Sequence, residues 1–255
     1  MKTIVVADTD VGIVKKTNQD SLCIRTADTK IGHVAMVVVC DGMGGLAKGE
    51  LASATVVREF ASWFENDFIQ TIETWSFAKL SEFWNNRIKE INEKISDYGQ
   101  KNNVKLGTTV TAFISINDEY MIFHVGVTRV YRISDDVNEQ LTEDQTLVWR
   151  EVKLGNLLPE QIETDPRRNI LLQCVGASRT VVPEIKFGRI QFDSNYVVCS
   201  DGFRHVITPQ EICSMMSPIV SNNESSMKCN IRSLIETVKS RKERDNITAV
   251  LIKFE

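Results

Sequence analysis

The sequence predicts an α+β fold in which largely antiparallel sheets are covered by helices. Two observations indicate this class. Short β-rich runs occur in groups, and two long amphipathic segments separate the first group from the second. A regular alternation of strand and helix, which would favour a doubly wound parallel sheet, is not evident. The 255 residues contain no internal repeat and no linker rich in Pro, Gly or Ser, so we expect one domain over residues 1–255.

The first β-rich group and the helices after it form the N-terminal part of the chain. The three runs are TIVVA from Thr3, SLCIRT from Ser21 and HVAMVVVC from His33. The third is almost entirely apolar, which is typical of a strand buried on both faces. Apolar residues at three- and four-residue steps then predict a helix between Leu51 and Phe64, and a second from about Trp75 to Tyr98.

Strands return in the second half of the chain. Three runs predict them: TTVTAFISI from Thr108, YMIFHVGV from Tyr120 and RVYRI from Arg129. Residues 142–169 are polar, and we expect this segment to be helical or irregular. EIKFGRIQF and NYVVCS then predict a strand pair joined around Asp193 and Ser194. Helices near residues 208–216 and 225–241 and a last strand, NITAVLIKF, complete the chain.

Composition and charge exclude several classes of protein. Hydrophobic residues make up 42% of the chain and charged residues 25%, which is ordinary for a soluble globular protein. The net charge of -4 gives no basic footprint for nucleic acid, and no polybasic run suggests a membrane surface. No apolar segment reaches the ~20 residues that cross a bilayer. The start, MKTIVVADTDVG, meets the charged Asp8 too soon for a signal peptide, so we expect a cytoplasmic protein.

Three aspartates stand where apolar runs meet a glycine or an asparagine. Asp41 follows VVVC and precedes Gly42, Asp201 follows VVCS, and Asp245 precedes Asn246. Asp-Gly is also a common turn dipeptide, so one copy alone has little weight. Carboxylates that converge at strand ends can hold hard cations such as Mg²⁺ or Mn²⁺, which take oxygen ligands. Two such ions that share one carboxylate can activate a water for attack on phosphorus.

The glycines that follow Asp41 raise a separate question. GMGGLAKGE lacks the G-K-[ST] that completes a P-loop, and it lacks G-x-G-x-x-G with an acidic partner about 20 residues on. These glycines alone therefore do not predict a phosphate cradle. At Gly42 the backbone can turn sharply and aim its carbonyl at the cation that Asp41 binds. Gly44 and Gly45 are expected to make the turn into the next helix.

Five motifs occur in one order over almost the whole chain. They are TDVGIVKKTNQDS (Thr9–Ser21), CDGMGGLAKGELAS (Cys40–Ser53), LGTTVTAF (Leu106–Phe113), CSDGF (Cys199–Phe203) and DNITAVLI (Asp245–Ile252). Together they resemble the bacterial branch of the type-2C metal-dependent serine/threonine protein phosphatases (PPM/PP2C), with departures that indicate a divergent member. The resemblance implies a central β-sandwich of two mostly antiparallel sheets flanked by helices on both sides, in α/β/β/α layers.

The resemblance also implies a chemistry. Two Mn²⁺ or Mg²⁺ ions would activate a water that hydrolyses phosphoserine and phosphothreonine in proteins, without a phosphoenzyme. Carried over to the matching positions, Asp41 would bridge both ions and the Gly42 carbonyl would bind the second ion. Asp201 and Asp245 would complete the shell of the first ion. The candidate catalytic residues are therefore Asp41, Asp201 and Asp245.

Three further positions follow from the same resemblance. Asp20 and Asn246 would lie around the metal-bound water without ligating the ions themselves. Lys15 stands where bacterial members place an arginine that meets the substrate phosphate. Lysine keeps the charge but loses the bidentate fork of arginine. A solvated surface lysine is the alternative for Lys15, and both interpretations stay open.

One departure from the family bears on the number of ions. HVGVTR has Val127 where the family usually has an aspartate that helps to bind a third metal in bacterial relatives. Valine offers no oxygen, so we expect a third ion to bind weakly or not at all, and turnover could suffer. Leu46 occupies a position where a histidine often follows DGMGG. Residues 142–169 match the variable flap of the family, which lies beside the active site and could influence the choice of substrate.

The expected partners are phosphoprotein substrates and a cognate Ser/Thr kinase that the phosphatase opposes, and a monomer is expected. Two alternatives remain open. Val127 and Lys15 suggest a catalytically weakened module that binds or regulates phosphoproteins. TIVVADTDVG resembles the opening of haloacid-dehalogenase phosphatases, with Asp8 as nucleophile and Asp10 as acid/base. That second alternative predicts a βαβ pattern and leaves DGMGG, SDGF and DNITAV unexplained.

Overall fold

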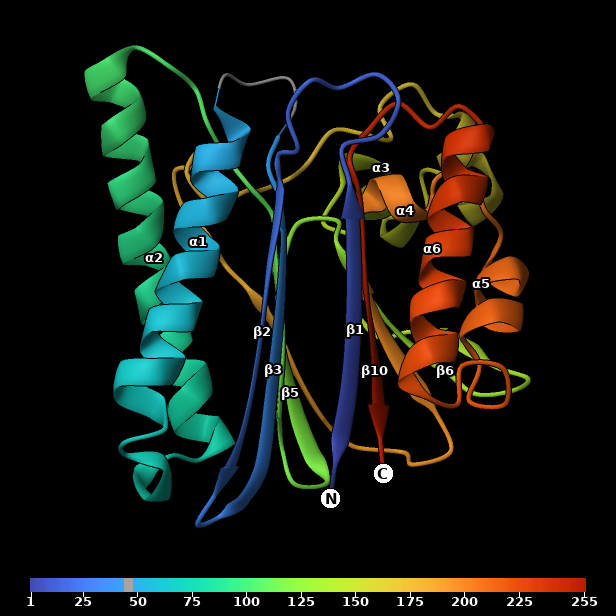
Figure 1. Cartoon of the computed structure of the whole chain (residues 1–255). Helices are drawn as coiled ribbons and strands as arrows, with labels where there is room; N and C mark the ends of the chain where they lie inside the picture. The colour runs from blue at the N-terminus through green and yellow to red at the C-terminus, as the bar shows by residue number, and fades with distance from the viewer. Residues whose placement is uncertain (44–47) are drawn as a thin grey trace.

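Two five-stranded sheets lie face to face, and helices cover the outer face of each sheet (Figure 1). This order of layers confirms the predicted fold class. The computed structural model describes residues 1–43 and 48–255, so the turn predicted at Gly44 and Gly45 and the position of Leu46 lie outside the described residues. No helix within the described ranges is long and apolar enough to cross a membrane.

Neighbouring strands pair antiparallel in both sheets. One sheet has the order β2 (Asp20–Thr29), β3 (Gly32–Asp41), β4 (Val110–Ile116), β5 (Glu119–Val125) and β8 (Glu184–Arg189). The other has the order β1 (Thr3–Asp10), β10 (Ile247–Phe254), β9 (Asn195–Cys199), β6 (Arg129–Ile133) and β7 (Asn138–Gln140).

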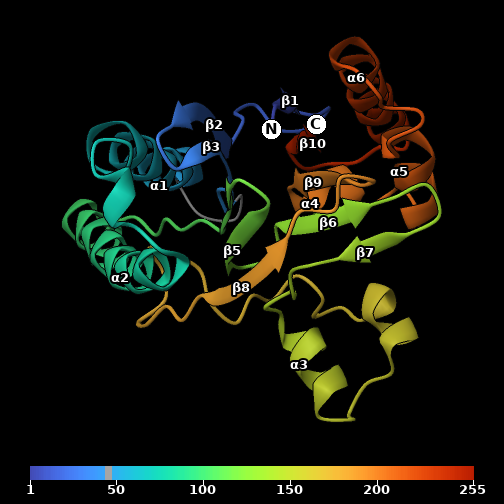
Figure 2. The ribbon, with the colours of Figure 1, turned by 90° about the horizontal axis from the view of Figure 1, so that it is seen from below.

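The helices divide between the two outer faces. The β3 sheet carries α1 (Gly49–Trp63) and α2 (Phe77–Asn102), with a π turn (Phe64–Phe68) and a 3-10 turn (Ile72–Thr74) between them. The β10 sheet carries α4 (Asp201–Arg204), α5 (Pro209–Met216) and α6 (Glu224–Ser240). A further segment, α3 (Leu147–Lys153) with a 3-10 turn (Pro159–Thr164), projects to one side of the sandwich in the end-on view (Figure 2).

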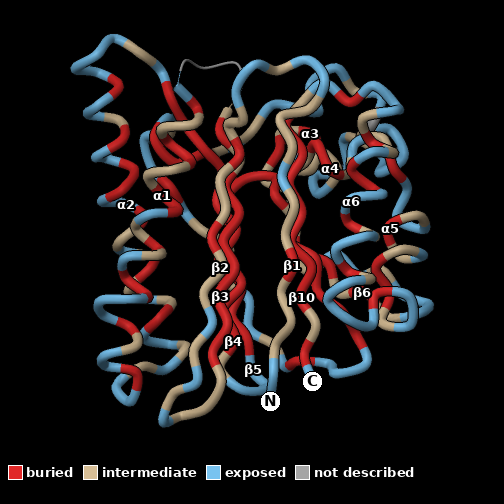
Figure 3. Tube along the Cα trace, in the orientation of Figure 1, coloured by how far each residue is buried: buried red, intermediate tan, exposed pale blue. Residues whose placement is uncertain are grey.

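Three apolar layers hold these elements together, one between the sheets and one between each sheet and the helices on its outer face (Figure 3). β3 contributes to two of them, because Val38 faces the helices and Val39 faces the other sheet. Its burial on both faces was predicted from its apolar run. Under the first helices, Phe60 of α1 stacks on Trp84 of α2 with ring centroids 3.5 Å apart. Replacing Trp84 by alanine would cost about 3–5 kcal/mol of stability.

Local signals in the sequence explain where several helices begin. The Ser76 side chain accepts a hydrogen bond from the backbone N–H of Lys79 at the start of α2. At the start of α5, Thr208 and Glu211 bond to each other's backbone N–H, which satisfies two donors that a helix end leaves open. The predicted helices and strands lie within a few residues of their observed positions.

One prediction about strand pairing is wrong. EIKFGRIQF and NYVVCS do not form a hairpin, because β8 pairs with β5 in one sheet and β9 pairs with β10 and β6 in the other. The chain crosses between sheets over residues 190–194, where the Tyr196 hydroxyl accepts a hydrogen bond from the backbone N–H of Gln191. Turn residues such as Asp193 and Ser194 mark the change of direction. They do not show whether the next strand stays in the same sheet.

Candidate active site

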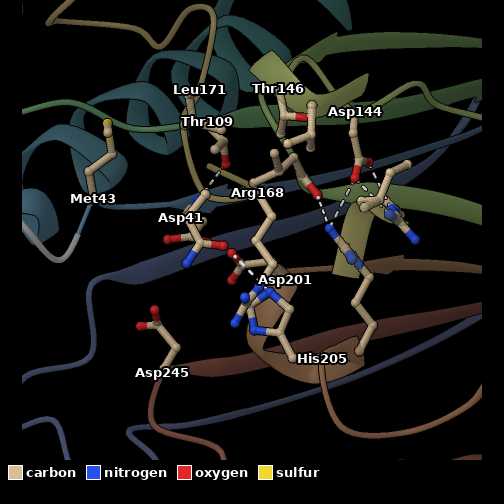
Figure 4. A pocket seen from close by; sticks show the side chains of 16 residues that line it. Asp41, Met43, Thr109, Asp144, Thr146, Arg168, Leu171, Asp201, His205 and Asp245 are labelled. Carbon is tan, nitrogen blue, oxygen red and sulfur yellow. Dashed lines mark hydrogen bonds and ion pairs between the residues drawn. The ribbon is translucent and has the colours of Figure 1, made fainter. Parts of the chain in front are cut away.

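The three aspartates singled out in the sequence line one cavity of about 340 Å³ at an end of the sandwich (Figure 4). Strand direction explains why they meet. β9 ends two residues before Asp201, and its antiparallel neighbour β10 begins two residues after Asp245, so both lie at one edge of their sheet. Asp41 is the last residue of β3 in the opposite sheet. The two sheets therefore bring Asp41, Asp201 and Asp245 together.

The glycine after each of two aspartates lets backbones approach closely. A Cβ at Gly42 would lie 2.4 Å from the carbonyl oxygen of Gly49, and a Cβ at Gly202 would lie 2.1 Å from that of Asn246. Real Cβ atoms do not approach other atoms so closely, so both positions require glycine for space. The contact at Gly202 brings the start of α4 against the segment before β10. The role of the Gly42 carbonyl as a metal ligand stays a prediction.

Two threonines of the LGTT motif fix the backbone of Asp41. The Thr108 hydroxyl and the Thr109 backbone N–H both donate to the Asp41 carbonyl at 2.9 Å. The Thr109 hydroxyl in turn accepts from the Asp41 backbone N–H at 3.0 Å. Both backbone groups of Asp41 are thus held, which leaves its carboxylate to face the cavity. The sequence pointed to this motif through the resemblance but did not predict what it does.

The carboxylates around Asp41 repel one another. Burial raises the pKa of Asp41 well above its usual range, and the charges of Asp201, Asp20 and Asp245 raise it further. Burial also raises the pKa of Asp20 to about 7, although nearby hydroxyl groups oppose the shift. Asp201 Oδ1 and Asp20 Oδ2 are buried and have no hydrogen-bond partner in residues 1–43 and 48–255. Hard divalent cations prefer such oxygens, so this donor set fits Mn²⁺ or Mg²⁺.

Asp245 differs from the other aspartates because a lysine holds it. Lys15 Nζ lies 3.1 Å from Asp245 Oδ1. An ion that used Asp245 would therefore compete with the Lys15 ammonium. With Lys15 in this position, no three His, Cys, Asp or Glu side chains of the described part of the chain are arranged to hold a metal ion. Lys15 lies beside the acidic residues and is only partly exposed, and its contact with a substrate phosphate stays a prediction.

Asn246 and Asp20 lie directly beside the aspartates of the site, Asn246 next to Asp245 in the chain and Asp20 opposite Asp41 in the neighbouring strand. The Asn246 side chain donates to the carbonyls of Val11 at 2.9 Å and Thr17 at 3.2 Å, and it accepts from the backbone N–H of Gln19 at 2.9 Å. It thereby anchors the loop between β1 and β2 that carries Lys15. Asp20 begins β2 directly across from Asp41. The placement of Asp20 and Asn246 around a metal-bound water stays a prediction.

The other side of the cavity is held by an ion network that the sequence did not predict. Asp144 accepts hydrogen bonds from Arg129 at 2.8 and 2.6 Å, and Arg204 Nη2 lies 3.3 Å from Asp144 Oδ2. Burial acts to raise the pKa of Asp144, but the two guanidinium groups outweigh it and hold the pKa below the usual value. Arg204 also donates to the carbonyl of Val127 at 3.3 Å. A fixed positive charge therefore lies next to position 127.

Two more residues at the cavity extend the predicted set. His205 stands four residues after Asp201, and its Nε2 lies 3.5 Å from Asp201 Oδ2. Burial lowers the pKa of His205, but the hydrogen bond to Glu243 and the charge of Asp201 outweigh this and raise it. Arg168, at the end of the 142–169 segment, was missed. An arginine in a polar segment resembles any solvated surface charge, so the sequence carried no signal for it.

The first acids of the chain take no part in this cavity. Asp10 pairs with Lys239 of α6 at 2.9 Å, and Asp8 lies 3.5 Å from Arg232 of the same helix. Their strand, β1, pairs antiparallel with β10 and is not part of a βαβ unit. The haloacid-dehalogenase alternative required a parallel sheet with Asp8 at a reaction centre. The structure does not support that alternative.

The structure is an antiparallel sandwich with three aspartates that converge at one end, and comparison with known proteins gives its family. The sequence model of protein phosphatase 2C matches residues 13–236. The chain therefore belongs to the protein phosphatase 2C family.

Relatives and solved structures agree with this assignment over the full chain. The serine/threonine phosphatase stp of Listeria innocua serovar 6a is 30% identical over 251 residues, which cover 96% of this chain and 93% of that protein. The protein phosphatase PhpP of Streptococcus pneumoniae serotype 2 is 28% identical over 254 residues, covering 96% and 95%. The structure of the serine/threonine phosphatase Stp1 from Staphylococcus aureus matches with a TM-score of 0.86 at 27% identity, covering 100% of this chain and 96% of that one.

Proposed function

We propose that this protein hydrolyses phosphoserine and phosphothreonine in proteins with two divalent ions, Mn²⁺ or Mg²⁺. The observation that carries the proposal is the convergence of Asp41, Asp201 and Asp245 on one cavity, with buried carboxylate oxygens that lack partners among the described residues. Relatives support the same reaction class, since proteins 30% and 28% identical are named serine/threonine phosphatase and protein phosphatase.

Each acidic residue has a proposed part in holding the ions. Asp41 would bridge both, because it faces the pair formed by Asp201 and Asp245 from the opposite sheet, and the Gly42 carbonyl would bind the second ion. Asp201 and Asp245 would share the first ion, since they lie at the same sheet edge. Bound ions of this kind act as Lewis acids and lower the pKa of a water that attacks phosphorus. Asp20 lies across from Asp41 in the neighbouring strand and adds negative charge to the site.

The cations of the chain have separate parts in the proposal. Lys15 would meet the substrate phosphate once an ion takes over its place beside Asp245. The Val127 side chain offers no oxygen, the residue is 7% exposed, and Arg204 donates to its carbonyl, so a third ion is not part of the proposal. A fixed guanidinium there adds positive charge near the incoming phosphate without an ion.

The proposal includes the surroundings of the site. Residues 142–169 would act as a flap beside the substrate, because this segment projects from the sandwich and its Arg168 lines the cavity (Figure 2). The substrates would be proteins phosphorylated by a Ser/Thr kinase, which the enzyme opposes. Residues 1–255 would act as one phosphatase domain in a monomer.

The test is hydrolysis of p-nitrophenyl phosphate and of a phosphothreonine peptide by protein stripped of metal and reloaded with Mn²⁺. Asp41→Asn keeps the volume of the side chain and removes its charge, so activity should fall by at least the ~10–100-fold that follows the loss of a group supporting a metal ligand. Asp8→Asn is the matched control, because Asp8 lies outside the cavity, and it should keep full activity.

Two outcomes would contradict the proposal. Loss of activity in Asp8→Asn with retention in Asp41→Asn would place the chemistry outside the cavity. If the unaltered protein and Asp41→Asn are equally inert in Mn²⁺ while both bind the phosphopeptide, the protein is a binding module and not an enzyme.

A further inference from the structure

A glutamate and a histidine connect the two aspartates that are proposed to share an ion. Glu243 stands two residues before Asp245 and is 8% exposed, and His205 stands four residues after Asp201. We propose that Glu243 and His205 are positioning residues that hold Asp201 and Asp245 in the geometry required for a divalent ion. The inference rests on the proposed metal site, and it assigns these two residues a role in metal affinity.

Glu243 fixes the backbone of the Asp245 side of the site. Its Oε1 accepts hydrogen bonds from the backbone N–H groups of Arg244 at 2.7 Å and Asp245 at 3.0 Å. A buried carboxylate that accepts two backbone N–H groups holds the turn before β10 in one conformation. The position of the Asp245 side chain therefore depends on Glu243.

His205 extends the same connection to Asp201. Its Nδ1 lies 3.5 Å from Glu243 Oε2, and its Nε2 lies 3.5 Å from Asp201 Oδ2. The ring thus stands between two carboxylates that come from segments far apart in the chain. Glu243 uses one oxygen for the Asp245 turn and the other for the histidine, so one side chain is linked to both aspartates.

This arrangement leaves a defined oxygen for an ion. Because His205 faces Oδ2 of Asp201, the oxygen without a partner in the described ranges is Oδ1, which is buried. Groups that hold metal ligands in place typically change metal affinity by about 10–100-fold when they are lost. Glu243 and His205 contact the proposed ligands through the Asp245 backbone and the Asp201 carboxylate, so their effect should appear in ion binding first.

The test measures the dissociation constant of Mn²⁺ directly, by the electron paramagnetic resonance signal of the free ion and by calorimetry, on full-length protein. Glu243→Ala should weaken Mn²⁺ binding by about 10–100-fold, and His205→Ala by a smaller factor. Glu243→Gln keeps an oxygen for the Asp245 N–H, so its dissociation constant for Mn²⁺ should lie between those of Glu243→Ala and the unaltered protein. The double variant should bind Mn²⁺ no more weakly than Glu243→Ala does, because both residues act along one connection.

Glu236→Gln is the matched control, since this exposed glutamate on α6 pairs with Lys239 and Arg232 and does not contact the site. Circular dichroism and unfolding of the metal-free variants show whether each one folds. If Glu243→Ala does not fold, Glu243→Gln and His205→Ala still decide the result. At saturating Mn²⁺ the variants should recover most of kcat for p-nitrophenyl phosphate, which a role in the chemical step would not allow.

The outcomes separate this inference from the proposed function. If the unaltered protein binds Mn²⁺ and hydrolyses phosphate esters while the folded variants bind Mn²⁺ within about twofold of it, the positioning role is overturned and the function stands. If the unaltered protein does not bind Mn²⁺, both are overturned. Additive losses in the double variant would show that Glu243 and His205 act separately, which contradicts the shared connection.

Discussion

The two sides of the cavity manage charge in opposite ways. On one side, Asp41 and Asp201 face each other with raised pKa at Asp41 and a buried oxygen without a partner in the described residues. On the other side, Asp144 is paired with Arg129 and Arg204, and its pKa is lowered. Both sides bury carboxylates at the same end of the sandwich. Asp144 is paired with cations of the chain itself, whereas Asp41 has no ion-pair partner among the described residues.

The difference shows how a structure can distinguish a binding site from a structural ion network. Burying a carboxylate costs free energy unless opposite charge lies close to it. The Asp144 side offsets that cost within the chain and so contributes to the stability of the metal-free protein. The Asp41 side does not, so its residues lower stability until ions bind, which is typical of functional sites. Three predictions test this contrast, from the largest expected effect to the smallest.

The largest effect is expected for Asp144→Ala in the metal-free protein. The change leaves two largely buried guanidinium groups without their carboxylate, so the free energy of unfolding should fall by about 3–5 kcal/mol. Urea unfolding in the presence of a chelator measures it. The paired experiment is Asp41→Asn, which relieves repulsion and should leave the free energy of unfolding unchanged or raise it. If Asp144→Ala lowers the free energy of unfolding by less than about 0.5 kcal/mol, the proposed contrast between the two sides of the cavity is wrong.

The pH dependence of metal-free stability should follow the acidic side. Burial raises the pKa of Asp20 from its ordinary value of 3.8 to about 7 in the folded protein, so the folded state binds the proton more tightly. Stability should therefore fall as pH rises from about 4 to about 6, and by no more than about 4 kcal/mol up to pH 7. Asp144 has a lowered pKa, so its contribution is lost only as pH falls below about 4.

Urea midpoints of the metal-free protein across this range measure the pH effect. Asp20→Asn should flatten the slope, and added Mn²⁺ should raise the midpoint most at the higher pH values. A midpoint that rises between about pH 4 and about pH 6 in the unaltered protein would have the wrong sign for repelling carboxylates.

The smallest effect is expected for Lys15→Met, because Lys15 and Asp245 are 28% and 39% exposed. A partly exposed ion pair contributes about 0.2–1 kcal/mol, so removing the competing ammonium should tighten Mn²⁺ binding by at most about fivefold. The same change should raise KM for a phosphothreonine peptide. Calorimetry and steady-state kinetics measure both, with the exposed neighbour Lys16→Met as control. If both variants match the unaltered protein, Lys15 is a surface residue.

Much of the fold could be predicted from local patterns. The apolar run from His33 indicated a strand buried on both faces, and the stripes from Leu51 and Trp75 indicated the two helices over it. These patterns are readable because burial imposes a period on the sequence within one element. The crossing from β8 to β9 could not be read in this way. A turn has the same composition whether the chain stays in its sheet or changes sheet.

The residues of the candidate site also differ in whether the local sequence could indicate them. Asp41, Asp201 and Asp245 could be singled out because each stands beside a strand end and a small or amide residue, which are features of the local sequence. The Asp144 network and the connection from Glu243 through His205 to Asp201 could not. Arg129 and Arg204 are 15 and 60 residues from Asp144, and Glu243 lies in a different segment from His205, so neither local sequence indicates its partner.

The sequence by itself determined the helices, the strands and the aspartates at the strand ends, because burial and turn chemistry act over a few neighbouring residues. The order of layers and the family followed from the resemblance of five motifs to a known family. Only the tertiary structure decided which carboxylates have a counter-charge. It placed a lysine on Asp245, two arginines on Asp144, and a histidine between Asp201 and Glu243. Electrostatic energy depends on distance through space, and that distance exists only when both sheets have come together.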